Sequence, residues 1–155
     1  MRIVGGGDRG RRLYAPRGRG TRPTAERVRV LDLFAGTGAV GIEALSRGAA
    51  RSVFVEKERE AVRALRRNLA ALGASRKAAR VVVGDVVTVL PLLAREEAPV
   101  DLAFLDPPYA APRISRALDA LVQSGLLGPG ARVVVQHFAK GFVDAVPGLV
   151  SDREP

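Results

Sequence analysis

The sequence predicts one α/β domain with a doubly wound, mostly parallel sheet. Two observations support this fold class. Short apolar segments rich in Val and Leu alternate with longer segments whose apolar residues recur at helical spacing, and several of the short segments end in an acidic residue. The chain has 155 residues, of which 47% are hydrophobic, so it is long enough to bury a core of its own.

The expected elements follow one another at a regular pace. We expect strands at 28–34, 51–56, 79–83, 100–105 and 131–135, and helices at 39–47, 58–72, 86–96 and 112–125. Gly48 and Gly73 lie where glycine commonly ends a helix. Pro91 falls inside the third helix and is expected to start or kink it. Right-handed crossovers would bring the carboxyl ends of the strands to one edge of the sheet, where ligands bind in such folds.

A glycine turn follows the first of these strands. Gly36, Gly38 and Gly41 have the spacing G-x-G-x-x-G, which also occurs in nicotinamide dinucleotide sites, and Glu56 would then be the acid that holds a ribose. However, Asp32 precedes the turn, and its charge would repel a pyrophosphate held at the helix N-terminus. A ligand that carries a cation or an amine suits the turn better.

Acidic residues follow four of the expected strands: Asp32, Glu56, Asp85 and Asp106. A carboxylate at Glu56 can accept hydrogen bonds from ribose hydroxyls, and Asp85 is placed to accept one from an adenine amino group. Asp85 could equally cap the helix that follows it.

Asp106 begins the motif Asp106-Pro107-Pro108-Tyr109. The two prolines remove amide donors, so the rim that remains consists of hydrogen-bond acceptors and can hold an exocyclic amino group. Tyr109 would supply a surface on which a flipped base stacks.

The positive charge is concentrated near the start of the chain. Residues 1–30 contain nine arginines and only two acidic residues, so they carry +7 of the net charge of +9. This predicts a basic arm at 1–28 that binds phosphates, ahead of a domain at 29–155. Ile3-Val4 and Leu13-Tyr14 could form a short hairpin within the arm.

Several classes of protein are excluded or disfavoured by composition. The chain has no cysteine and one histidine, which excludes disulfides, a cysteine nucleophile and a zinc site of the usual kind, so we expect no metal. No apolar segment is long enough to span a membrane, and the first residues do not resemble a signal peptide, so a cytoplasmic protein is expected.

Two motifs resemble those of a known class of enzyme. The segment D-L-F-A-G-T-G at 32–38 resembles motif I of the class I S-adenosylmethionine-dependent methyltransferases, and D-P-P-Y at 106–109 resembles the (D/N)-P-P-(Y/F) motif of those that methylate exocyclic amino nitrogens. Taken together, the chain resembles the RsmD family, bacterial methyltransferases that act on N2 of a guanine in 16S ribosomal RNA. The residues that carry this resemblance are 2–6, 9–13, 22–24, 32–49, 55–56 and 106–109.

The resemblance implies a Rossmann-like fold, S-adenosylmethionine as cofactor and the 16S rRNA of the small ribosomal subunit as partner, with the protein a monomer or a weak dimer. The cofactor-binding residues that it implies are Asp32, Phe34, Gly36, Gly38, Glu56, Lys57, Asp85 and Val86. The target guanine would be held by Asp106, Pro107, Pro108 and Tyr109. The RNA-binding residues would be Arg2, Arg9, Arg11, Arg12, Arg22 and Thr24.

The sequence departs from the family pattern at two places. A helix that precedes the first strand in the family has no counterpart here, and the chain ends where the family continues through a final antiparallel strand pair. We therefore expect an exposed sheet edge near 131–135, unless a partner or a dimer covers it.

Three alternatives stay open at this point. The first is an adenine-N6 methyltransferase acting on nucleic acid, because D-P-P-Y alone does not exclude it. The second is a nicotinamide-dependent oxidoreductase, which would leave D-P-P-Y unexplained. The third is a non-catalytic RNA-binding relative, for which salt-dependent RNA binding without cofactor affinity is expected.

Overall fold

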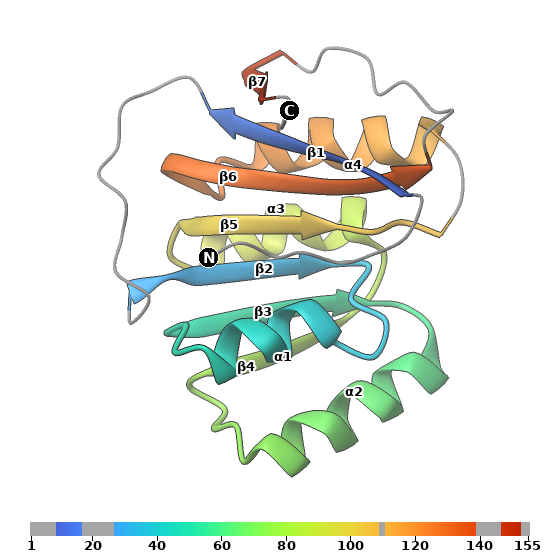
Figure 1. The fold of residues 1–155 in the computed structure, drawn as a ribbon, viewed down its shortest axis with the longest axis vertical. Coiled ribbons are helices and arrows are strands. Elements are labelled where there is room, and N and C mark those ends of the chain that lie inside the picture. Colours follow the sequence, from blue (N-terminus) through green and yellow to red (C-terminus); the bar gives the residue numbers. More distant parts are fainter. Residues whose placement is uncertain (1–8, 17–26, 109–110, 139–146, 153–155) are drawn as a thin grey trace.

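The computed structural model describes residues 9–16, 27–108, 111–138 and 147–152 (Figure 1). The strands are β1 (Arg9–Pro16), β2 (Arg29–Leu33), β3 (Arg51–Glu56), β4 (Ala79–Val83), β5 (Val100–Leu105), β6 (Leu127–Phe138) and β7 (Leu149–Asp152). The helices are α1 (Ala39–Ser46), α2 (Arg59–Leu72), α3 (Val86–Glu96) and α4 (Ala111–Ser124).

These strands form one seven-stranded sheet in the order β4-β3-β2-β5-β6-β1-β7. The pairs β3–β4, β2–β3, β2–β5 and β5–β6 are parallel, and Leu31 of β2 lies between Val53 of β3 and Ala103 of β5. The chain runs outward from β2 to β4 and then crosses back to β5. The order of the strands therefore reverses between β2 and β5, which is the point where sheets of this kind bind ligands.

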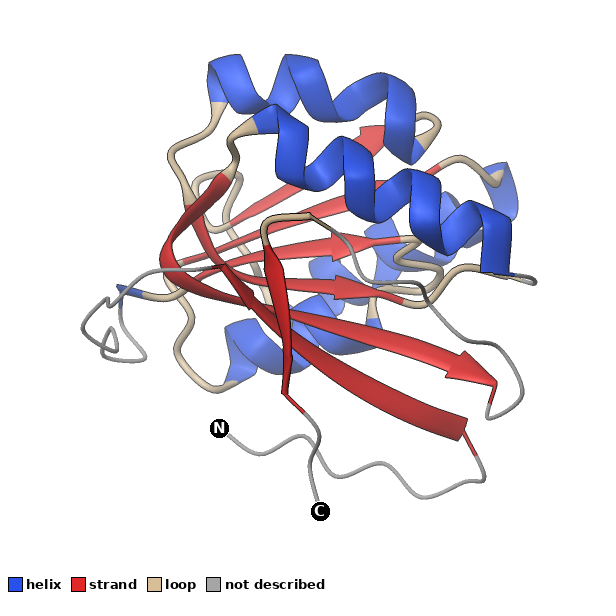
Figure 2. Cartoon of the chain, turned by 90° about the horizontal axis from the view of Figure 1, so that it is seen from above, coloured by secondary structure: helices blue, strands red, loops and turns tan. Residues whose placement is uncertain are grey.

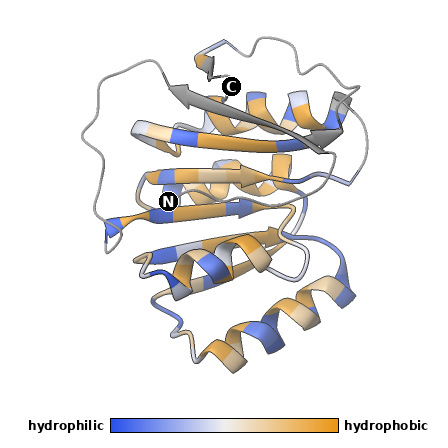
Figure 3. Ribbon diagram, viewed as in Figure 1, coloured by the Kyte–Doolittle hydropathy of each residue, from blue (hydrophilic) through white to orange (hydrophobic). Residues whose placement is uncertain are grey.

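Helices cover both faces of the sheet (Figure 2). Helices α1 and α2 lie against one face, where Phe54, Leu65 and Leu69 form a buried cluster. Helices α3 and α4 pack against each other on the opposite face, above a larger core that includes Leu90 and Leu118. Figure 3 shows hydrophobic residues concentrated in the central strands, whereas the helices carry both hydrophobic and hydrophilic residues. A fully buried Leu or Phe contributes about 1.5–3 kcal/mol by transfer from water, so these two clusters supply most of the cohesion of the domain.

The strand and helix positions predicted from the sequence are confirmed to within about two residues, except for β6. Gly48 and Gly73 have positive φ angles of 93° and 73° at the ends of α1 and α2, as expected of glycines that terminate helices. Helix α3 continues through Pro91 rather than starting there. Strand β6 begins at Leu127, four residues before the predicted position, because the segment pairs with β5 already at Val100.

The expectation that the sheet edge near 131–135 is exposed is wrong. Strand β1 pairs antiparallel with β6 from Arg9 opposite Phe138 to Tyr14 opposite Val133, and so covers that edge. Strand β7 then pairs antiparallel with β1, which corrects the expectation that the sheet lacks a final antiparallel pair. The physical reason is that backbone donors and acceptors on a strand edge require partners, and a segment from the start of the chain supplies them here.

The same pairing changes the interpretation of the basic arm. Leu13 and Tyr14 lie within β1 and pair with β6 and β7, not with a neighbouring hairpin strand. Residues 9–16 therefore belong to the same sheet as the domain that begins at Arg29. Ile3 and Val4, the other half of the predicted hairpin, lie outside the described residues.

Charged residues gather at the amino ends of the strands, opposite the site. Glu97, after α3, forms ion pairs with Arg29, Arg51 and Arg80 at 3.0, 2.6 and 2.9 Å, and its side chain is only 4% exposed. The arginines begin β2, β3 and β4 or lie near those starts, so one carboxylate joins three parallel strands. The hydrogen bonds from Arg51 and Arg80 hold the pKa of Glu97 below its usual range, although burial opposes this.

Within the part of the chain that the structure describes, no helix has the length and apolar character that a membrane crossing requires.

Candidate active site at the carboxyl edge of the sheet

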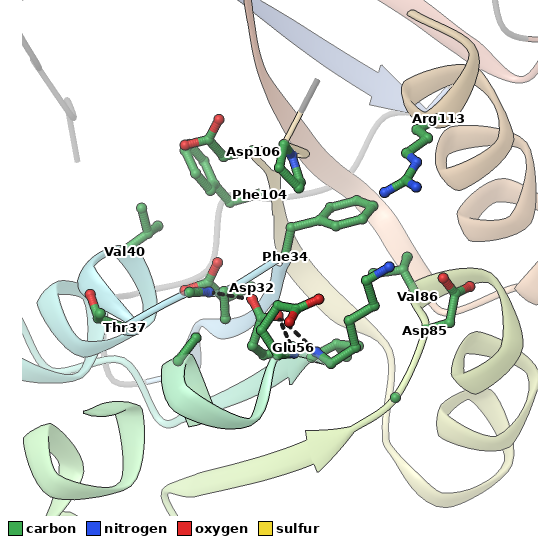
Figure 4. A pocket seen from close by; sticks show the side chains of 18 of the residues that line it. Asp32, Phe34, Thr37, Val40, Glu56, Asp85, Val86, Phe104, Asp106 and Arg113 are labelled. Carbon is green, nitrogen blue, oxygen red and sulfur yellow. Dashed lines mark hydrogen bonds between the residues drawn. The ribbon is translucent and has the colours of Figure 1, made fainter. Parts of the chain in front are cut away.

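A cavity of about 1070 Å³ opens at the carboxyl ends of β2, β3, β4 and β5 (Figure 4). This volume is at the upper end of the range for small-molecule sites. The residues that line it are Asp32, Phe34, Ala35, Gly36, Thr37, Ala39, Val40, Val55, Glu56, Lys57, Glu58, Ala61, Gly84, Asp85, Val86, Phe104, Asp106, Pro108, Arg113 and Arg116.

The turn between β2 and α1 is built from three residues in the left-handed region. Phe34, Gly36 and Gly38 have φ angles of 58°, 57° and 86°. Glycine adopts this conformation without cost, but a residue with a side chain pays roughly 1–2 kcal/mol. Phe34 is the only such non-glycine residue among those described, and its ring lies in the middle of the site (Figure 4). The turn is braced by the Ala35 amide, which donates to the Val55 carbonyl at 3.0 Å.

The three glycines of the motif have different roles. A Cβ on Gly36 would meet nothing within 4 Å, and this residue lines the cavity. Gly38 does not line the cavity, because it faces the core: a Cβ there would lie 2.2 Å from Leu65. A Cβ on Gly41 would lie 2.3 Å from the ring of Phe54. Gly38 thus allows α1 to pack closely against α2, Gly41 allows it to pack closely against β3, and Gly36 leaves room beside the ligand space.

Asp32 is the most perturbed acid of the site. It lies at the end of β2, is only 2% exposed, and accepts a hydrogen bond from the Gly41 amide at 3.0 Å. Burial, helped by the charges of Asp106 and Glu56, raises its pKa to about 7, while the Gly41 bond opposes the shift. A cation beside Asp32 would favour its ionised form, so the carboxyl is suited to a positively charged ligand.

Glu56, at the end of β3, is held in place by three backbone amides. Its Oε2 accepts from the Gly36 amide at 2.8 Å, and its Oε1 accepts from the amides of Lys57 and Glu58 at 2.8 and 2.9 Å. A carboxylate has about four acceptor positions, so this bracing leaves capacity for a ligand hydroxyl. The prediction that Glu56 holds a ribose is compatible with this geometry and stays a prediction.

Asp85 and Val86 line the cavity at the end of β4, as predicted, and Lys57 lines it beside Glu56. The Asp85 side chain also accepts from the Val87 amide at 3.0 Å, so it caps α3, which was the alternative role considered for it. Such a cap fixes the carboxyl in one orientation, with Val86 forming an apolar wall next to it.

Asp106 and Pro108 follow β5 and line the cavity across from Asp32, whereas Pro107 is buried outside the lining. Asp106 is close enough to Asp32 for its charge to raise the pKa of that residue. The end of β5 and the end of β2 therefore place two acids at the point where the strand order reverses. Tyr109 lies outside the described residues.

The structure adds residues that sequence reasoning missed. Phe104 lines the cavity next to Asp106, and Arg113 extends toward it from α4 (Figure 4). Arg116, also on α4, lines the cavity as well. The spacing of apolar residues does not show that these arginines reach the cavity, although they follow the D-P-P-Y motif closely and are one helical turn apart. Other lining residues outside the predicted set are Ala35, Thr37, Ala39, Val40, Val55, Glu58, Ala61 and Gly84.

The predicted RNA-binding residues are only partly placed. Arg9, Arg11 and Arg12 belong to β1, where they pair with β6 at Phe138, Gln136 and Val135. Arg2, Arg22 and Thr24 lie outside the described residues. The prediction that they bind RNA is not tested by this arrangement.

In the described ranges no group of three His, Cys, Asp or Glu residues is arranged to hold a metal ion.

A doubly wound sheet with a glycine turn and an acid at the end of the first parallel strand is typical of the class I methyltransferases, and solved structures of that class resemble this fold. The chain belongs to the RsmD family, because the family model described as "Conserved hypothetical protein 95" matches residues 1–152.

Named relatives agree with this assignment. Ribosomal RNA small subunit methyltransferase D of Escherichia coli is 35% identical over 162 residues, which cover 95% of this chain and 79% of that protein. The solved structure of a putative methyltransferase from Escherichia coli, yhhF, superposes with a TM-score of 0.63 at 35% identity, over 72% of this chain and 59% of that one. The O-methyltransferase TomG from Streptomyces achromogenes, solved in complex with SAM, gives a TM-score of 0.60 at 30% identity over 72% of this chain and 49% of that one.

Proposed function

We propose that this protein transfers a methyl group from S-adenosylmethionine to the exocyclic N2 of a guanine in small-subunit ribosomal RNA. The observation that carries the proposal is the joint placement of Asp32 and Asp106 at the reversal point of the sheet, in one cavity, within a chain of the RsmD family. The relatives' names supply the class of substrate, and the family supplies the guanine N2.

The residues of the cavity fit the cofactor on two grounds. Burial, helped by the charges of Asp106 and Glu56, raises the pKa of Asp32 to about 7, so its ionised form is unfavourable without a compensating cation, and S-adenosylmethionine carries a sulfonium and an ammonium. Apolar side chains, among them Phe34, Val55 and Val86, line the same cavity and provide surface for an adenine ring. Glu56 would accept hydrogen bonds from the ribose hydroxyls, and Asp85 would face the adenine amino group.

When bound, S-adenosylmethionine supplies an electrophilic methyl group on its sulfonium. The contribution of the protein is to orient the amino group of the base toward that position, and positioning of this kind can contribute about 7–11 kcal/mol. Asp106 would accept a hydrogen bond from the amino group and ease the loss of its proton. Pro107 and Pro108 have no amide hydrogen, so the rim beside Asp106 presents acceptors to the amino group.

The remaining parts of the proposal concern the surroundings of the site. The arginines near the start of the chain would hold ribosomal RNA through its phosphates, so RNA affinity should fall with salt concentration. A protein that acts on ribosomal subunits would work in the cytoplasm, as a monomer or a weak dimer.

The test is a methyl-transfer assay with labelled S-adenosylmethionine and unmethylated small-subunit rRNA, both free and assembled into the subunit. The expected product is N2-methylguanosine, identified by mass spectrometry of the digested RNA. Asp106→Asn should reduce the rate at least tenfold, whereas the control Asp119→Asn, an exposed acid on α4 outside the cavity lining, should not. Recovery of N6-methyladenosine would replace the proposal with the adenine reaction, and absence of any methylated nucleoside would refute it.

A further inference from the structure

The wall of the cavity that α4 provides carries two arginines without an assigned role. Arg113 and Arg116 both line the cavity and both are exposed to solvent. They are three residues apart, so they lie on neighbouring positions of one helix face. In the described part of the chain neither forms an ion pair, and Asp119, on the same helix, pairs with neither of them.

The cavity carries both acidic and basic side chains. Asp32 and Glu56 occupy the side formed by β2 and β3, and Arg113 lies across the ring of Phe34 from them (Figure 4). Among the described residues Arg113 and Arg116 form no ion pair with Asp32 or Glu56, so the two sides can bind different ligand groups at once. The acids suit the cationic cofactor of the proposed function, which leaves the arginines for an anion.

The position of the arginines identifies the anion. Arg113 and Arg116 follow Asp106 and Pro108, the residues proposed to hold the target base, and line the same cavity. An enzyme that acts on a base must take it out of the stack, and the sugar–phosphate backbone then follows the base to the mouth of the pocket. Guanidinium groups bind phosphate oxygens in bidentate fashion and stay charged at every physiological pH.

We propose that Arg113 and Arg116 form a phosphate-binding subsite that holds the RNA phosphodiester next to the flipped nucleotide. This inference rests on the proposed function, because it requires an RNA substrate whose target base enters the cavity. It assigns the arginines a positioning role: they act on the backbone of the substrate and not on the reacting atoms.

The test compares two double variants that remove the same charge at the same spacing. Arg113→Gln/Arg116→Gln removes the subsite, and Arg63→Gln/Arg66→Gln removes two exposed arginines of α2 that do not line the cavity and form no ion pair within the described residues. For each variant, the Kd for S-adenosylmethionine, the Kd for unmethylated small-subunit rRNA at several salt concentrations, and the kcat and KM of methyl transfer are measured.

The expected result is a rise of about tenfold per arginine in the Kd and KM for RNA in the α4 variant, since each would lose a charge-assisted hydrogen bond to phosphate. The slope of log Kd against log salt should fall in magnitude by about 1.4, as two phosphate contacts to a single strand are lost. The Kd for S-adenosylmethionine should stay unchanged. The α2 variant should change RNA binding less than threefold.

Three outcomes would overturn the inference. Equal losses in the two double variants would show a general charge effect. A weaker Kd for S-adenosylmethionine with RNA binding unchanged would assign the arginines to the carboxylate of the cofactor. Unchanged values throughout would remove the subsite while leaving the proposed function intact. Failure of the proposed function is recognised separately, by the absence of RNA methylation with the unaltered protein, and would remove the subsite with it.

Discussion

The carboxylate of Asp32 and the amide of Gly41 are joined by a hydrogen bond of 3.0 Å, which ties the end of β2 to the first turn of α1. This bond favours the ionised carboxylate, but burial and the neighbouring acids Asp106 and Glu56 outweigh it and raise the pKa to about 7. The site thus keeps an acid in an environment where its charge is unfavourable until a cation arrives. Binding sites often sacrifice stability in this way.

This relationship predicts how stability depends on pH in the absence of ligand. The folded pKa of Asp32 is about 7 and its ordinary value is 3.8, so the folded state holds the proton more tightly and stability falls as pH rises between these values. Each pH unit in that window is worth about 1.4 kcal/mol at most. Asp32→Asn should therefore be more stable than the unaltered protein by about 2 kcal/mol near pH 5 and by about 4 kcal/mol near pH 8. Urea unfolding at both pH values measures this, and a stability difference that is the same at pH 5 and pH 8 would contradict it.

The packing of α1 against the sheet predicts a coupling between Gly41 and Phe54. A methyl group on Gly41 would overlap the Phe54 ring, which is fully buried, so Gly41→Ala should cost about 1–3 kcal/mol. Gly36→Ala is the matched control, because its cost comes from the positive φ angle and not from crowding. The smaller side chain of Phe54→Leu should recover part of the cost of Gly41→Ala and none of that of Gly36→Ala. A double-mutant cycle on unfolding free energies gives the coupling, and a value near zero for the Gly41 pair would count against this packing.

The bracing of Glu56 predicts that one substitution affects both stability and binding. Glu56→Gln keeps one acceptor oxygen but places an amide donor near backbone N–H groups, so we expect a loss of roughly 2 kcal/mol in unfolding free energy. The affinity for S-adenosylmethionine should fall at least tenfold as well, because the ribose loses its acceptor. Glu60→Gln, an exposed acid of α2 outside the cavity lining, is the control. Retention of full affinity in Glu56→Gln would leave the residue with a structural role alone.

The ion pairs of Glu97 predict a second pH dependence of the unfolding free energy, opposite in sign to that of Asp32. The pKa of Glu97 is lowered in the folded state, so its contribution is present above its ordinary pKa and is lost as pH falls through the folded value. Removal of the charge leaves Arg29, Arg51 and Arg80 without their shared partner, and Glu97→Gln should cost about 2–4 kcal/mol at pH 7.

The more exposed Glu96 binds Arg80 alone, so Glu96→Gln should cost less than about 1 kcal/mol. Chemical unfolding between pH 3 and pH 7 separates the two variants. A Glu97→Gln protein that loses stability in acid as steeply as the unaltered one would show that the cluster is not the source of the effect.

Much of the fold could be predicted from the sequence because it depends on local patterns. Five strands with four helices between them follow from runs of Val and Leu and from helical spacing, and the end of α2 follows from Gly73. The pairing of β1 with β6 could not be predicted in this way, because it joins residues more than a hundred positions apart and depends on which backbone edge is left open. Sequence reasoning therefore expected an open edge that the start of the chain in fact covers.

In the site, too, some residues follow from local sequence patterns and others depend on tertiary packing. Asp32, Glu56, Asp85 and Asp106 could be placed together because the carboxyl ends of parallel strands meet at one edge. Arg113 could not, because nothing in a helical pattern indicates which face of α4 reaches the cavity. Gly38 packs closely against Leu65, a role that the spacing of glycines does not reveal, and its binding of the cofactor stays a prediction.

The central claim is that the acidic cavity at the carboxyl edge binds S-adenosylmethionine, and calorimetric titration tests it most directly. The unaltered protein is titrated with S-adenosylmethionine and separately with NAD, and Asp32→Asn is titrated with both. The account predicts binding of S-adenosylmethionine, weakened at least tenfold in Asp32→Asn, and no binding of NAD. Binding of NAD in place of S-adenosylmethionine, or binding of neither by the folded protein, would contradict it.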